Sequence, residues 1–148
     1  MTEYMAEALK EAKKAFEEDE IPIGCVVVSD GKIIACEHNS KIQDNDSLAH
    51  AEMKALFAAQ KALGTKYLYD CEMFVTVEPC AMCAGAMVNA RLGKLTYAVR
   101  EPKTGCCGSK FDLIGGCFNH TVQVTTGDGE EEAKELMQAF FAQKRGKK

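Results

Sequence analysis

The chain has 148 residues and a formal net charge of −4, and we expect one domain over residues 1–148 with a single core. Hydrophobic residues make up 47% and charged residues 27% of the chain, as in ordinary soluble proteins. No apolar run is long enough to cross a membrane, and the N-terminal MTEYMAEALKEAKKAF does not have the order of a secretory signal, so we predict a cytoplasmic protein with no membrane segment.

The first half of the chain predicts two helices around a β-hairpin. Apolar residues at helical spacing indicate an amphipathic helix over residues 3–18. The β-rich runs IGCVVV and KIIACE flank Ser-Asp-Gly and predict two strands joined by a tight turn. A polar loop over 39–49 leads into a helix from His50 to Leu63, which ends before Gly64. Three residues of this second helix are expected in the core: Met53, Leu56 and Phe57.

The second half alternates strands and helices. Strands are predicted at 72–77, 94–99 and 121–125 and helices at 80–92 and 129–145, with a long Gly- and Cys-rich loop over 100–118. The last helix has acidic residues at its start and basic residues at its end, which suits the helix dipole. This order of elements predicts an α/β fold of three layers, α/β/α, in which helices cover both faces of a central five-stranded mixed sheet.

Basic residues gather in two segments of an otherwise acidic chain. Residues 91–110 hold five basic residues and one acidic residue, and the closing KRGKK holds four basic residues. Such segments could dock a polyanion locally despite the negative net charge. Solvated surface and a frayed tail are the commoner origin of such runs, and composition does not separate the two.

Two short motifs carry the chemistry. His50-Ala51-Glu52 opens one predicted helix, and Pro79-Cys80-Ala81-Met82-Cys83 opens another. Cys80 and Cys83 are three residues apart, so both sulfur atoms point the same way in a first helical turn. A helix N-terminus favours thiolates, the form that a metal binds. With His50 this makes three protein ligands, and catalytic zinc sites use three and keep the fourth position for water.

Glu52 is the candidate proton carrier of this site. Residues two apart face away from each other in mid-helix, so Glu52 and His50 can reach one pocket only where the helix has barely begun. The motif places them there. H-x-E with P-C-x-x-C is the signature of zinc-dependent nucleobase deaminases. We therefore expect one Zn²⁺ per chain, held by His50, Cys80 and Cys83, with Glu52 as the catalytic acid and base.

Longer strings point to one branch of these enzymes. EPCAMCAGAM, KTGCCGS and NHTV resemble the bacterial tRNA-specific adenosine deaminases of the cytidine deaminase superfamily, and the resemblance runs from IPIGCVVV to FFAQKR. It implies a cytidine-deaminase-like fold and a homodimer. It also implies hydrolytic conversion of adenosine to inosine at the wobble position of a tRNA anticodon, with Glu52 moving protons to the purine and to the leaving ammonia.

The same resemblance implies residues that hold the RNA. Asn39, in EHNSK, corresponds to an asparagine that helps to hold the target nucleoside. Lys103 in the long loop, and Phe141 and Arg145 in the last helix, correspond to positions that contact the anticodon stem-loop. The expected partners are therefore tRNA and a second copy of the chain.

Three other interpretations stay open on the residues alone. A deaminase of free guanine, cytosine or a nucleoside would share the zinc site but would have no use for a basic loop and tail. A non-catalytic zinc-binding module would take a fourth ligand from Cys106, Cys107 or Cys117 and leave Glu52 without a role. A CxxC pair after a strand also occurs in thioredoxin-like redox proteins, although HAE is not expected there.

The remaining cysteines and histidines have simpler explanations. Cysteines in or beside predicted strands are expected to be buried small side chains: Cys25, Cys36 and Cys71. His38 and His120 are expected to be structural. Glu78 stands beside Pro79, and we expect it to fix the turn there.

Overall fold

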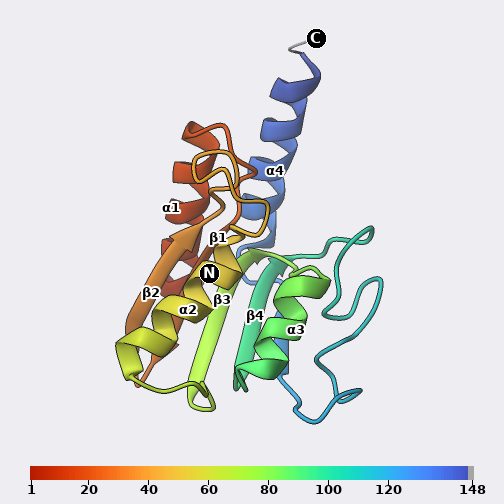
Figure 1. The fold of residues 1–148 in the computed structure, drawn as a ribbon. Helices are drawn as coiled ribbons and strands as arrows, with labels where there is room; N and C mark the ends of the chain where they lie inside the picture. The colour runs from red at the N-terminus through yellow and green to blue at the C-terminus, as the bar shows by residue number, and fades with distance from the viewer. Residues whose placement is uncertain (147–148) are drawn as a thin grey trace.

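The computed structural model describes residues 1–146, in which helices cover both faces of a central sheet (Figure 1). Helices α1 and α4 pack on one face, and α2 and α3 pack on the other. The predicted three-layer α/β/α fold is therefore confirmed. In chain order the elements of this part are α1 (Glu3–Glu17), β1 (Gly24–Ser29), β2 (Lys32–His38), α2 (Ala51–Leu63), β3 (Cys71–Val77), α3 (Ala81–Asn89), β4 (Lys94–Val99), β5 (Gln123–Thr126) and α4 (Glu130–Arg145).

The strand order of the sheet brings several chain segments together at one edge, the edge formed by the ends of β2, β3 and β4 and the start of β1. The order is β2-β1-β3-β4-β5, with β1 antiparallel to β2 and β3, and with β3, β4 and β5 mutually parallel. Gly24 at the start of β1 pairs with His38 at the end of β2, and its N–H donates to the hydroxyl of Thr76 near the end of β3. The loops that follow β2, β3 and β4 therefore begin at the same edge of the mixed sheet.

Two element boundaries differ from the prediction by more than one residue. Helix α3 ends at Asn89, three residues before the predicted end, because Arg91 has a left-handed backbone with φ of 56° that turns the chain toward β4. Strand β5 begins at Gln123 and not at 121, because the N–H of Val122 donates to the carbonyl of Ile114 in the long loop. Local sequence patterns predict neither the left-handed backbone of Arg91 nor the hydrogen bond between Val122 and Ile114.

Helix α1 lies close against β1. A Cβ atom at Gly24 would lie 2.0 Å from the carbonyl oxygen of Ala8 and 2.4 Å from the nitrogen of Ala12, so only glycine lets the helix backbone approach this near. Met5, Leu9 and Ala12 of the predicted amphipathic face are buried against the sheet. The close contact fixes the end of β1 that borders the shared edge.

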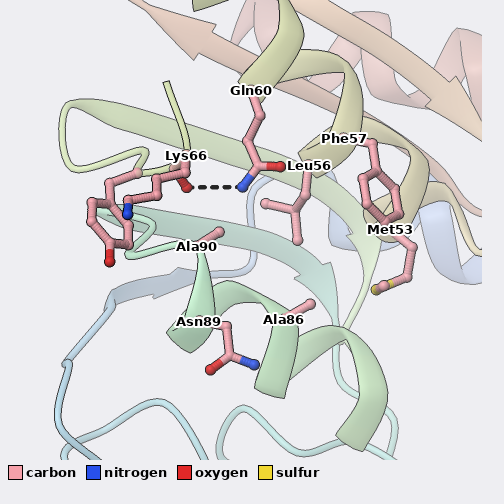
Figure 2. Close-up of a pocket in the computed structure, with 9 residues that line it drawn as sticks. Met53, Leu56, Phe57, Gln60, Lys66, Ala86, Asn89 and Ala90 are labelled. Carbon is pink, nitrogen blue, oxygen red and sulfur yellow. Dashed lines mark hydrogen bonds between the residues drawn. The ribbon is translucent and has the colours of Figure 1, made fainter. Parts of the chain in front are cut away.

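The apolar stripe of α2 is narrower than predicted. Leu56 is buried, but Met53 is only half-buried and the ring of Phe57 is 62% exposed, so its placement in the core was wrong. Small residues at helical spacing face the sheet, and Phe57 is rotated about 100° from Leu56 along the helix. Phe57 instead lines a groove of about 410 Å³ between α2 and α3, to which Met53 and the core residue Leu56 also contribute (Figure 2).

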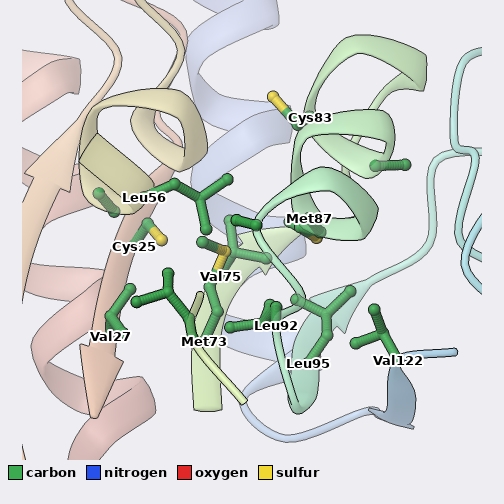
Figure 3. Packing of buried hydrophobic residues seen from close by; sticks show 14 of the residues in the cluster. Cys25, Val27, Leu56, Met73, Val75, Cys83, Met87, Leu92, Leu95 and Val122 are labelled. Carbon is green, nitrogen blue, oxygen red and sulfur yellow. The ribbon is translucent and has the colours of Figure 1, made fainter. Parts of the chain in front are cut away.

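The larger core lies between the sheet and the α2–α3 layer (Figure 3). Cys25 and Cys71 are buried in it, as predicted. Cys36 is exposed, so the prediction that it is buried was wrong: β2 is the edge strand of the sheet, and its outer residues are only partly covered. Cys83 contributes to the same core from α3, which ties the candidate site to the best-packed part of the fold.

Helix α4 continues past the end of the sheet (Figure 1). Gly129, with φ of 77°, precedes a first turn of three glutamates, and Lys144 and Arg145 occupy the last turn, so both ends suit the helix dipole as predicted. The last two lysines of KRGKK lie outside the described residues. No helix within residues 1–146 is long and apolar enough to span a bilayer.

Candidate active site

Two helix N-termini meet at the shared edge of the sheet. His50 is the N-cap of α2 and Cys80 is the N-cap of α3, each with an extended backbone. Neither side chain makes the usual capping hydrogen bond to its own helix. Both are therefore available for another partner, and Cys83 lies in the first turn of α3 beside them.

The three expected ligands come together at coordination distance. The Nδ1 atom of His50 lies 3.6 Å from the sulfur of Cys80 and 3.5 Å from the sulfur of Cys83, and the three ligand atoms are all within 4.8 Å of one another. Tetrahedral zinc with Zn–S of about 2.3 Å and Zn–N of about 2.0 Å would hold S and N about 3.5 Å apart. The donor set and its spacing fit a zinc ion.

The two thiols have opposite proton affinities. A hydrogen bond with the Cys83 thiol, together with the neighbouring His50, lowers the pKa of Cys80 to about 3. The pKa of Cys83 is raised, first by its hydrogen bond to the Cys80 sulfur and then by burial. Cys80 therefore gives up its proton more readily than Cys83, and both would have to be thiolates to bind a metal.

Glu52 is buried without a full set of partners. Its side chain is 3% exposed, and burial raises its pKa to about 7. Within residues 1–146, its Oε1 is the buried side-chain nitrogen or oxygen atom with no hydrogen-bond partner. A buried oxygen atom without a partner is costly, so its presence beside the three ligand atoms indicates a functional role.

Asn39 occupies the adjoining position at the end of β2. It is 4% exposed, and its Oδ1 accepts a 2.9 Å hydrogen bond from the N–H of Ala51. Ala51 is the first residue of α2, so Asn39 supplies the N-terminal cap that His50 does not. This bond leaves the donor end of the Asn39 amide to face a ligand.

Glu78 does more than the predicted fixing of a turn. Its carboxylate accepts hydrogen bonds from the backbone N–H groups of Glu101, Cys107 and Ser109 at 3.0–3.1 Å and from the Ser109 hydroxyl. Burial by itself would raise the pKa of Glu78, but these bonds bring it below its usual value. Gly105 is required here, because a Cβ atom would lie 2.4 Å from the carboxyl carbon. Glu78, which follows β3 and precedes Pro79, therefore connects the loop after β4 to the end of β3.

The residues expected to touch RNA lie apart from one another. Lys103 is exposed on the loop after β4, and Arg145 is exposed in the last turn of α4. Phe141, 41% exposed, lines a cavity of about 370 Å³ together with Asn39. Two lysines that the motifs did not single out border the same cavity: Lys41 and Lys144.

Comparison with known proteins agrees with this geometry. A family model described as MafB19-like deaminase matches residues 1–145. A tRNA-specific adenosine deaminase of Bacillus subtilis is 47% identical over 146 residues, which cover 98% of this chain and 91% of that protein. The chain belongs to the tRNA-specific adenosine deaminase family.

Two solved structures have a fold similar to that of this chain. A structure from a study of A-to-I editing by tRNA:A34 deaminases at the wobble position superposes with a TM-score of 0.88 at 39% identity, covering 92% of this chain and 99% of that chain. A guanine deaminase from Nitrosomonas europaea reaches a TM-score of 0.82 at 27% identity, covering 94% and 83%. The fold is shared by both, and the sequence is closer to the tRNA:A34 deaminase.

The site of this deaminase has no fourth cysteine ligand in the part of the chain that the structure describes. The metal-competent group there consists of His50, Cys80 and Cys83. Cys106 and Cys107 are buried in the loop but do not belong to this group, and Cys117 is exposed. A structural zinc site with four protein ligands, the basis of the non-catalytic interpretation, is therefore not formed by these cysteines.

Sequence reasoning missed two residues that shape the site. Glu20 is 2% exposed, and its carboxylate accepts the backbone N–H groups of Ile42 and Gln43 in the loop after Asn39. Lys54, one turn into α2, reaches back to the same loop. Neither belongs to a motif, and an acid before a strand or a lysine within a helix gives no signal of its own.

Proposed function

We propose that this deaminase converts adenosine to inosine at the wobble position of a tRNA anticodon by hydrolysis. The observation that carries the proposal is the unpartnered Oε1 atom of buried Glu52, beside three ligand atoms whose spacing fits a zinc ion. The tRNA substrate is supported by family membership and by the relative from Bacillus subtilis, which is a tRNA-specific adenosine deaminase.

In this proposal, His50, Cys80 and Cys83 hold one zinc ion per chain. A zinc ion there supplies Lewis-acid activation of a water molecule. The N-termini of α2 and α3 add positive potential that stabilises the thiolates and any negative charge developing in the pocket. The buried surroundings of Cys83 and Glu52 keep bulk water away from the reacting atoms.

Glu52 is the proton carrier of the proposed reaction. It takes a proton from the attacking water and donates it to N1 of the purine. It then takes the proton of the new hydroxyl group on C6 and delivers it to the amino group, which leaves as ammonia. Its Oε1 is free for this task because no protein group occupies it. Asn39 binds an edge of the extruded base with the donor end of its amide, since Ala51 holds the other end.

The surroundings of Asn39 suit a flanking nucleotide of single-stranded RNA. The cavity between the loop after β2 and α4 combines the exposed ring of Phe141 with Lys41 and with Lys144, whose ammonium group pairs with Asp19 at 2.6 Å. An aromatic face stacks a base, and ammonium groups neutralise phosphates. Lys103 on the loop after β4 and Arg145 in the last turn of α4 are exposed, and both are proposed to contact the anticodon stem-loop.

One experiment decides between this function and deamination of a free base. Zinc-loaded protein is incubated with an anticodon stem-loop carrying adenosine at the wobble position, and separately with guanine, cytosine, cytidine and adenosine, and ammonia release is measured. A stem-loop with guanosine at the wobble position is the matched control. We expect release from the adenosine stem-loop only. Turnover of a free base or nucleoside with an inert stem-loop would refute the tRNA substrate.

We also propose that the deaminase is a homodimer that buries the groove between α2 and α3. Phe57 is 62% exposed there, and Met53 and Ala86 line the same groove (Figure 2). An exposed apolar groove of this kind is typical of a protein interface. Sedimentation analysis of wild type and of Phe57→Glu tests this: we expect a dimer and a monomer, and a monomeric wild type would contradict it.

We place the protein in the cytoplasm. All eight cysteines are free, and a reducing compartment preserves thiolate ligands and free thiols. The tRNA substrate proposed above is in the same compartment. Cell fractionation with an antibody against the chain tests the placement, and recovery in a secreted fraction would refute it.

A further inference from the structure

The loop between β2 and α2 has both of its ends in the active site. It begins at Asn39, which caps α2, and it ends at His50, the first expected metal ligand. Most of the residues between them are exposed, and they form turns but no helix or strand. The position of Asn39 therefore depends on what holds this short exposed segment against the body of the protein.

Lys54 bridges the two residues on either side of Asn39. Its ammonium group donates to the backbone carbonyl of His38 at 3.2 Å and to the hydroxyl oxygen of Ser40 at 2.7 Å. The side chain is 29% exposed, so these bonds are partly shielded from water. A charged donor shared by both neighbours fixes the backbone through Asn39 without touching the asparagine side chain.

The bonds of Lys54 continue into the rest of the loop. The Ser40 hydroxyl donates to Asp44 at 2.6 Å, so one oxygen links Lys54 to a residue four positions further on. On the other side of the loop, Glu20 accepts the N–H groups of Ile42 and Gln43 at 2.9 and 2.8 Å. The loop is thus held from α2 by a cation and from the segment before β1 by an anion.

We propose that Lys54 is a positioning residue, which holds the segment His38–Ser40 against α2 and thereby sets the Asn39 carboxamide for its contact with the base. The inference rests on the proposed function for the role of Asn39. The structural part does not, because the Asn39–Ala51 hydrogen bond can be observed in the protein itself. Lys54 acts through Asn39 and makes no contact with the reacting atoms.

Amide hydrogen exchange of Ala51 reads out the proposed effect directly. Ala51 is the first residue of α2, so its N–H has no partner within the helix and is protected by Asn39. In zinc-loaded protein we expect Lys54→Met to speed exchange of this amide about tenfold or more, and we expect the same of Asn39→Ala. Lys54→Arg, which keeps a charged donor, should restore protection. Lys61→Met, an exposed lysine of the same helix, is the matched control and should change nothing.

Kinetic measurements then test whether a displaced Asn39 carboxamide changes the reaction of the substrate. We expect Lys54→Met to lower kcat/KM on the substrate that wild type deaminates by about ten- to a hundredfold at unchanged zinc content. The same substitution made in Asn39→Ala should cost nothing further, because Lys54 acts through that residue. Unchanged Ala51 exchange in Lys54→Met, or an equal loss of activity in the two backgrounds, would overturn the inference. If wild-type protein does not deaminate the stem-loop, the proposed tRNA substrate is refuted. The exchange of the Ala51 amide then still decides whether Lys54 positions Asn39.

Discussion

In the candidate active site, two helix N-termini hold three potential metal-ligand atoms within 4.8 Å of one another, whereas the residues expected to bind RNA lie exposed on two separate segments. His50 and Cys80 are N-caps, and Cys83 is buried in the larger core. Lys103 and Arg145 have no such support, since one stands on a loop and the other in the last turn of α4. The fold holds the side chains of His50, Cys80 and Cys83 in place. The side chains of Lys103 and Arg145 are exposed, and a bound partner would have to hold them in place.

Catalysis and RNA recognition place different requirements on the side chains that carry them out. Transfer of protons needs atoms held to a fraction of an ångström, which buried side chains on rigid helices provide. Docking of a polyanion depends on the charge of a wide surface, which long exposed side chains provide at little cost in stability. Substitutions in the two regions should therefore differ in both the size and the kind of their effect.

The largest effect is expected from removal of a metal ligand. Cys80→Ser and Cys83→Ser should each reduce bound zinc from one per chain to near zero and reduce deamination to background, because a hydroxyl does not replace a thiolate ligand. Elemental analysis of purified protein measures the zinc. Cys36→Ser, at an exposed cysteine on the edge strand, is the control and should keep both metal and activity. Full zinc content in either ligand variant would contradict the assigned site.

A large loss of activity with the metal in place is expected from Glu52→Gln. Glutamine has nearly the same shape but carries no transferable proton, so turnover should fall by about 10²–10⁴-fold. Zinc content should stay at one per chain, since Glu52 is not a ligand. Single-turnover assays with the stem-loop measure the rate. Loss of zinc would show that Glu52 has been misassigned, and near-normal turnover would remove it from the mechanism.

The region that the sequence predicted well is the one with the strongest local determinants. HAE and PCAMC specify both the residue types and a place at the start of a helix, and the structure brings those residues together where strands of known order end. The alternation of strands and helices likewise predicted the layers. Phe57 was misplaced because helical spacing alone does not say how wide the buried stripe of α2 is.

Long-range contacts supplied what the sequence could not. The ties from Glu20 and Lys54 to the loop after β2 join residues 14–23 positions apart and depend on the folded geometry. The role of Glu78 was expected to be local, but its carboxylate organises a loop more than twenty residues away. Such contacts have no periodicity or motif that a single sequence displays.

Glu78 joins the two regions of the comparison, and its substitution should have an intermediate effect. Glu78→Gln replaces an acceptor of several N–H groups by an amide, so we expect the free energy of unfolding to fall by about 1–3 kcal/mol. Denaturant unfolding measures this. Glu135→Gln, at an exposed position of α4, is the control and should change stability little. If the unfolding free energy is unaffected, the carboxylate does not hold the loop.

The smallest effect on chemistry is expected from charge reversal on the outer surface. Lys103→Glu and Arg145→Glu should each weaken binding of the stem-loop about tenfold or less at moderate salt, and should leave zinc content and stability as in wild type. The reason is that each removes about one phosphate contact, which contributes roughly 0.7 to the slope of log affinity against log salt. The slope should therefore become shallower by about that amount per substitution.

Filter binding over a salt series measures both quantities. Lys32→Glu is the matched control: it makes the same change of charge at the start of β2, whereas the active site adjoins the end of that strand, so its slope should remain that of wild type. If all three variants weaken binding equally, only net charge matters and the assigned contacts fail. If Lys103→Glu and Arg145→Glu bind with the wild-type slope, RNA docks on another surface. In that case the cavity bordered by Phe141, Lys41 and Lys144 is the next surface to test.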